Sequence, residues 1–209
     1  MTQYNIIAES QEYTVVAEFD HVATPAEAYQ SEADLEKEFI RLLGEQGYEY
    51  LPIHKEADLI FNLRDQLEKL NHYHFTDNEW EHFFNECIAN KNDDIVAKTQ
   101  KIQDDYIQVL KRDTGESQNI KLIDKDNIHN NFVQVINQYV EEGGNYDTRY
   151  DVSILVNGLP LVHIELKRRG VQLKEAFNQI NRYQRDSFWA GCGLYEYVQI
   201  FVISNGTNT

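Results

Sequence analysis

Three charged residues toward the C-terminal end of the chain have the types and spacing of a hydrolytic metal site. They lie in RYDVSILVNGLPLVHIELKRR (residues 149–169), which predicts two β-strands joined by a tight turn, with Asp151 on the first strand and Glu165 and Lys167 on the second. Because side chains alternate along a strand, Glu165 and Lys167 share one face. Two carboxylates suit a hard cation such as Mg²⁺, which also binds water and substrate phosphate. A neighbouring lysine can orient or deprotonate the attacking water, or stabilise charge on the phosphate. The pattern therefore indicates metal-assisted phosphodiester hydrolysis.

The turn between the strands sets a geometric condition on this site. Asn157-Gly158 is typical of a two-residue type I′ turn, and in that register Asp151 lies opposite Ile164 and faces away from Glu165. A shared face for the two carboxylates requires a β-bulge or a three-residue turn. Pro160 cannot donate to the ladder and is the candidate position for the irregularity. A clean two-residue hairpin would exclude the site.

Two alternatives compete with a nuclease. From spacing alone, an exposed cross-strand ion pair is the commoner explanation of such charges. The net charge of −16, from 35 acidic and 19 basic residues, also fits a non-catalytic acidic docking domain that binds basic subunits, and taken alone it argues against nucleic acid. Between Glu165 and Arg185, however, six basic residues face two acidic ones, a local balance of +4. The basic surplus thus lies beside the candidate site.

The remaining composition limits the protein class. No window is apolar enough for a membrane span, and the N-terminus lacks the pattern of a secretion signal. Two cysteines in unrelated contexts, Cys87 and Cys192, fit a reducing, cytoplasmic location. A zinc site built from His72, His74, His82 and Cys87 is disfavoured, because Cys87 lies on the apolar face of its predicted helix and His82 points elsewhere.

Hydrophobic periodicity predicts the elements that must position the site. Helices are expected at residues 31–46, 56–70, from 76 past 88, 93–104 and 173–186. Strands are expected at 48–51, 106–111, 119–124, 131–140, 150–156, 161–167 and 197–203. This order predicts an α/β (α+β) domain over residues 31–209 with a central mixed sheet flanked by helices. Residues 1–30 are expected to form an arm or edge strand. The end at SNGTNT, directly after a strand, suggests a fragment of a longer chain.

Several of these motifs together resemble one nuclease family. Asp151 followed by Glu165-Leu166-Lys167 resembles the PD-(D/E)xK signature, and NGLPLVHIELK, AFNQINRYQRDSF and FVISNG resemble the endonuclease domain of the R (restriction) subunit of type I restriction-modification enzymes. Gln179 and Tyr183 match the family's Q-x-x-x-Y motif. The likeness extends from about Ser31 to Ser204. Tyr150 departs from the signature, which has a proline before the aspartate.

The resemblance assigns roles to particular residues. Asp151 and Glu165 would hold Mg²⁺, and Lys167 would act on the water or the phosphate. A first-helix acid, Glu36 or Glu32, would complete the acidic site. Support of the site or DNA binding would fall to four further residues, Gln179, Tyr183, Arg168 and Arg182.

The resemblance also implies a restriction-endonuclease-like fold, double-stranded DNA as substrate, and modification and specificity subunits as partners of the full-length chain. The family carries an ATP-driven motor after this domain, but no G-x-x-x-x-G-K-[ST] loop occurs in these 209 residues. ATP binding by that motif is therefore expected only in the missing portion. Cleavage without sequence recognition is expected here, and an isolated fragment could be inactive.

Overall fold

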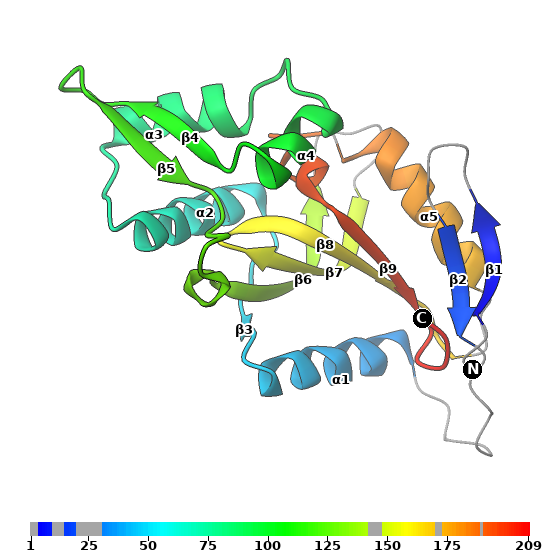
Figure 1. Cartoon of the computed structure of the whole chain (residues 1–209). Coiled ribbons are helices and arrows are strands. Elements are labelled where there is room, and N and C mark those ends of the chain that lie inside the picture. Colours follow the sequence, from blue (N-terminus) through cyan, green and yellow to red (C-terminus); the bar gives the residue numbers. More distant parts are fainter. Residues whose placement is uncertain (1–3, 10–14, 20–30, 142–147, 170–172, 189) are drawn as a thin grey trace.

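A five-stranded mixed sheet organises the computed structural model of the chain (Figure 1). The structure describes residues 4–9, 15–19, 31–141, 148–169, 173–188 and 190–209. The sheet has the order β3-β6-β7-β8-β9, with β3 parallel to β6, β6 and β8 antiparallel to β7, and β9 parallel to β8. Two-stranded sheets are formed by β1 with β2 and by β4 with β5. The mixed α/β class expected from the sequence is confirmed.

The elements have the following bounds. The strands are β1 (Tyr4–Glu9), β2 (Val15–Phe19), β3 (Glu49–Tyr50), β4 (Ile107–Lys111), β5 (Ser117–Lys121), β6 (Val133–Glu141), β7 (Thr148–Val156), β8 (Leu159–Leu166) and β9 (Ile200–Ser204). The helices are α1 (Glu32–Glu45), α2 (Glu56–Asn71), α3 (Asp77–Phe83), the π-helix η1 (Phe84–Ile88), α4 (Ile95–Gln103), the 3₁₀-helices η2 (Ile128–Asn130) and η3 (Leu194–Tyr197), and α5 (Leu173–Asp186).

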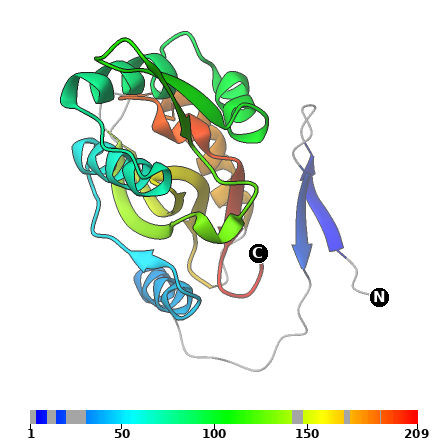
Figure 2. The same cartoon turned by 60° about the vertical axis from the view of Figure 1, so that its left-hand side comes forward.

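Helix α1 covers one face of the sheet, and α2 to α4 gather over the other (Figures 1 and 2). The α1 start is capped as the sequence predicts, because the Ser31 side chain accepts a hydrogen bond from the Asp34 backbone N–H. The smaller core lies under α1 and contains Leu43, Val135, Val152, Ile164 and Leu166. Burial of this stripe fixes α1 against the strands that carry the candidate site.

The larger core fills the opposite face of the sheet. It buries Leu59, Leu63 and Leu67 of α2 completely, together with aromatic residues from α3, η1, β6, β7 and η3. The turn between β7 and β8 packs on this side, since a Cβ added to Gly158 would lie only 2.5 Å from the Leu63 Cα atom. The α2 backbone thus holds the hairpin end opposite to the candidate site.

Several elements differ from the sequence-based expectation; β5, for example, is Ser117–Lys121 rather than residues 119–124. The helix that begins after Thr76, with the predicted capping box, continues past Phe83 as a π-helix. The last strand begins at Ile200 rather than Tyr197, because Tyr197 ends the 3₁₀-helix η3 and its buried hydroxyl donates to the Ile88 carbonyl oxygen at 2.9 Å. Among the helices that the structure describes, none is both long and apolar enough to cross a bilayer.

Candidate active site

The β7–β8 hairpin contains the bulge that the site requires. Val156 pairs with Leu159 across the two-residue turn, and the register then shifts so that Ile154 pairs with Val162. Asn157 and Gly158 have φ angles of 51° and 84°, as in a type I′ turn. The unpaired extra residue is therefore Leu161, directly after Pro160. Of the two predicted irregularities the bulge is the one observed, and the turn itself keeps two residues.

The bulge changes which residue lies beside Asp151. Beyond it Val152 pairs with Ile164, so the next positions along the two strands are Asp151 and Glu165. The ladder stops there, and an Asp151 carboxylate oxygen instead accepts the Leu166 backbone N–H at 2.9 Å. Burial raises the pKa of Asp151 to about 7, and the charges of Glu165 and, more weakly, Glu36 add to the shift. The two strand carboxylates are thus close enough to repel each other.

Glu165 and Lys167 form an ion pair within the protein. The Lys167 Nζ atom donates to Glu165 Oε1 at 2.8 Å, and the Glu165 side chain is fully buried. Burial is the largest single effect and acts to lower the pKa of Lys167. The hydrogen bond to Glu165 and the negative charges of Glu165, Asp151 and Glu32 together outweigh it and raise the pKa above its ordinary value. The lysine is therefore held as a cation beside the acidic pair.

The two candidate acids of α1 contact different parts of the site. Glu36 accepts hydrogen bonds from Asn137 Nδ2, at 2.6 Å, and from Gln138 Nε2. Glu32 accepts the Arg168 backbone N–H at 3.1 Å, and its charge acts on Lys167. Glu36 therefore adjoins Asp151 and Glu32 adjoins the lysine, which leaves Glu36 as the better placed acid for the metal position.

The Q-x-x-x-Y pair of α5 lies close enough to the same acids for their charges to act on it. Gln179 Nε2 donates to the Tyr183 hydroxyl group. Burial raises the pKa of Tyr183, and the negative charge of Glu165 adds to the shift. Arg182 is exposed, with its guanidinium carbon 5.8 Å from the centroid of the Tyr183 ring, and Arg168 is exposed after β8. Both arginine side chains are therefore accessible to solvent.

Sequence reasoning missed two residues at this site. Gln138 has a φ of 52° within β6 and lies where the β6–β7 register would place a partner for Asp151. Nothing in the sequence signals this backbone conformation. His163 is fully buried, with Nε2 3.5 Å from Glu165 Oε2, and its position two residues before Glu165 on the same strand is a signal that could have found it.

The donor set fits a hard divalent cation. Glu165 Oε2 is buried and accepts no hydrogen bond from the described residues. A cation beside it would offset both the burial and the repulsion that raise the Asp151 pKa. Within the described ranges no three His, Cys, Asp or Glu side chains come together tightly enough to hold a metal ion by themselves. Two carboxylates, with water and phosphate oxygens as further ligands, are the ligand set that Mg²⁺ usually takes in proteins.

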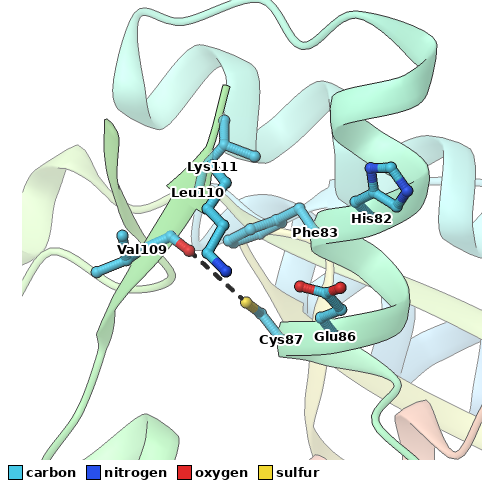
Figure 3. Close-up of a pocket in the computed structure, with 7 residues that line it drawn as sticks. All are labelled: His82, Phe83, Glu86, Cys87, Val109, Leu110 and Lys111. Atoms are coloured by element: carbon cyan, nitrogen blue, oxygen red, sulfur yellow. Dashed lines mark hydrogen bonds between the residues drawn. The ribbon is translucent and has the colours of Figure 1, made fainter. Parts of the chain in front are cut away.

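The zinc alternative is not supported by the geometry. Figure 3 shows Cys87 directed at β4, where its thiol lies 4.0 Å from the Val109 carbonyl oxygen, while His82 points away from it. Burial raises the pKa of the Cys87 thiol, which disfavours the thiolate that zinc needs. Cys87 packs against the larger core, as the sequence predicts.

Comparison with known proteins places this geometry in one family. The family model described as "Type I restriction enzyme R protein N terminus" matches residues 29–209. The endonuclease subunit of the type I restriction enzyme EcoprrI from Escherichia coli is 48% identical over 204 residues, which are 97% of this chain and 65% of that protein. Type I restriction enzyme endonuclease subunits from Staphylococcus saprophyticus and Staphylococcus aureus are 40% and 38% identical over 87% of this chain and 19% of their own lengths.

The chain thus spans about two thirds of one relative and a fifth of the others. The resemblance inferred from the D…E-x-K and Q-x-x-x-Y motifs is confirmed, and the mixed sheet flanked by helices fits a restriction-endonuclease-like domain. The chain belongs to the family of type I restriction enzyme R protein N termini.

Proposed function

We propose that residues 31–209 are a Mg²⁺-dependent DNA endonuclease domain of a type I restriction subunit, with residues 1–30 as an arm. The observation that carries the proposal is the bulge at Leu161, which brings Asp151 beside the Glu165–Lys167 ion pair. In an unbulged hairpin Asp151 would lie opposite Ile164 instead. A bulge that re-aims a side chain beside an active site is a common device in sheets.

Each residue of the site has a separate role in the proposed reaction. Asp151 and Glu165, with Glu36 or Glu32 from α1, would hold Mg²⁺, which supplies Lewis acidity toward the phosphate and lowers the pKa of a bound water. Lys167, a cation in its ion pair with Glu165, would orient the attacking water or stabilise negative charge on the phosphate. Gln179 and Tyr183 would fix the α5 side of the site.

The substrate proposed is double-stranded DNA, cut without sequence recognition by this domain. Its phosphates would meet the exposed Arg168 and Arg182, which lie in the most basic part of an otherwise acidic chain. The relatives are named as subunits of type I restriction enzymes, so modification and specificity subunits are the partners proposed for the full-length chain. ATP would act only in its remaining portion, and the assembly would be cytoplasmic.

The test replaces one carboxylate in the full-length subunit assembled with its partners. Glu165→Gln keeps the shape of the side chain and removes its charge, so DNA cleavage with Mg²⁺ and ATP should be abolished while the melting temperature stays near that of the unsubstituted enzyme. Glu196→Gln is the matched control, because Glu196 also pairs with a buried lysine, Lys98, but in a different part of the fold. That variant should still cut.

Full cleavage by Glu165→Gln would overturn the proposal. It would favour the acidic docking domain instead, in which the hairpin charges serve only the structure.

A further inference from the structure

His163 and Glu165 form a buried polar contact that the metal ligands and the lysine do not explain. They lie two residues apart on β8, share one face of the strand, and are both fully buried. Neither ring nitrogen of His163 has a hydrogen-bond partner within the described part of the chain, and neither has Glu165 Oε2. The His163 Nε2 atom lies 3.5 Å from that oxygen. A buried polar atom without a hydrogen-bond partner is destabilising, and an N–H at His163 Nε2 would supply the partner that Glu165 Oε2 lacks.

The His163 ring is held in place by aromatic neighbours. Its centroid lies 5.2 Å from that of Tyr150, 6.0 Å from those of Tyr183 and Phe188, and 6.4 Å from that of Phe201. The Tyr150 hydroxyl group donates to Ser187 Oγ, and the Tyr183 hydroxyl group lies 3.4 Å from the Arg149 carbonyl oxygen. These hydroxyl groups are therefore engaged elsewhere, and Glu165 remains the polar group that faces the imidazole.

We propose that His163 is a positioning residue for Glu165. With a proton on Nε2 the imidazole donates to Glu165 Oε2, while Lys167 Nζ holds Oε1, so the carboxylate is fixed from both sides. A carboxylate oxygen has two lone pairs, and Oε2 can accept this N–H and still face a cation. The inference rests on the proposed function, in which Glu165 is a metal ligand, and it assigns to His163 the orienting hydrogen bond that ligating carboxylates require.

The experiment measures metal affinity in the absence of DNA, using Mn²⁺ titration of the purified protein followed by electron paramagnetic resonance. His163→Phe keeps the ring and removes the donor, and should weaken Mn²⁺ binding about 10- to 100-fold. His163→Gln carries an amide near the Nε2 position and should bind Mn²⁺ more tightly than His163→Phe. His163→Asn, whose shorter amide lies near the Nδ1 position, should not recover the affinity. Phe83→Leu perturbs a buried aromatic ring of the larger core in α3, which packs on Phe75, and should leave the affinity unchanged.

The outcomes separate this inference from the proposed function. Equal Mn²⁺ affinity in the unsubstituted protein and the His163→Phe variant would overturn the positioning role alone. If His163→Phe fails to fold, equal affinity of the Gln and Asn variants would overturn it. Absence of Mn²⁺ binding by the folded, unsubstituted protein would overturn the proposed function and the inference with it.

Discussion

Lys167 is the residue whose role can be separated from metal binding. Its Nζ atom contacts Glu165 Oε1, and its charge also acts on the Asp151 carboxylate. A lysine cannot ligate the cation while it is protonated. In the proposed mechanism Lys167 therefore acts on the attacking water or on the phosphate.

Replacement of Lys167 by Met should separate binding from chemistry. The variant should still bind Mn²⁺, because both carboxylates remain and the removal of a repelling positive charge offsets the lost bond to Oε1. The rate of DNA cleavage should fall by about 10²-fold or more, the usual effect of removing one group that stabilises transition-state charge. Mn²⁺ titration and a cleavage time course measure the two quantities. Loss of Mn²⁺ binding in a folded variant would mean that Lys167 serves the metal site itself.

A second buried acid, outside the proposed site, couples stability to pH. Glu141 ends β6 with 3% of its surface exposed, and its carboxylate and that of Glu56 both flank Gly191. Burial, with the negative charge of Glu56 added, raises the pKa of Glu141 from 4.5 to about 8. Between these two pH values the folded state therefore binds more protons than the unfolded state, and stability falls as the pH rises through this window.

Glu141→Gln should remove this loss of stability. The free energy of unfolding of the unsubstituted protein should fall between pH 5 and pH 8.5, with Glu141 contributing on the order of 2–4 kcal/mol. Asp151, whose pKa is raised to about 7, contributes in the same direction, so the comparison of variants is what isolates Glu141. Urea denaturation at the two pH values measures the effect, and Glu81→Gln, an exposed acid on α3, is the control. Equal pH dependence in all three proteins would contradict the assignment.

At the scale of elements, the β7–β8 hairpin is held by the packing of its turn against α2. Gly158 and Gly115 both have left-handed φ angles, 84° and 86°. A Cβ at Gly158 would lie 2.5 Å from the Leu63 Cα atom, whereas a Cβ at Gly115, in the β4–β5 turn, meets nothing within 4 Å. Substitutions at these two glycines therefore distinguish the cost of backbone strain from the cost of steric overlap.

Gly115→Ala should cost about 1–2 kcal/mol of stability, the price of a left-handed alanine. Gly158→Ala should cost a further 1–3 kcal/mol or so, because the added methyl group displaces the α2 backbone. Urea denaturation of both variants gives the two free energies. Similar losses would show that the hairpin turn does not pack against α2 as described.

Much of this element could be predicted from the sequence. Asn157-Gly158 predicts the two-residue turn. In the register of that turn Asp151 and Glu165 face opposite sides of the sheet, so a bulge is needed to bring the two carboxylates together. Pro160 gives its approximate place, because a residue without an N–H disturbs the ladder least at an irregular position. The left-handed Gln138 and the π-helix after α3 have no comparable sequence signal. Their contacts join distant segments, since Gln138 donates to Glu36 and Ile88 of the π-helix accepts from Tyr197.

The residues of the site, too, could be predicted only in part from the sequence. Glu165 and Lys167 are recognisable because two charges alternate with apolar residues on a strand that buries both faces. The choice between Glu32 and Glu36 cannot be made from helical spacing, since both lie on one stripe, and only contact with β6 distinguishes them. The Glu56–Glu141 pair joins residues far apart in the chain, so no local sequence pattern predicts it.

At the scale of the whole molecule, the proposed site lies where the β7–β8 ladder ends. Helix α1 approaches it through Glu36, and α5 approaches it through Tyr183. The two hydrophobic cores on opposite faces of the sheet hold these helices in place. In the proposed function, the basic surplus between Glu165 and Arg185 would favour the approach of a DNA phosphate group to this part of an otherwise acidic chain.

The most direct test of this account is the anomalous diffraction of crystals soaked in Mn²⁺. The account predicts a manganese peak within coordination distance of both Asp151 and Glu165, and its loss in crystals of the Glu165→Gln variant. A peak elsewhere in the protein, or none between these two carboxylates at saturating Mn²⁺, would contradict the proposed metal site.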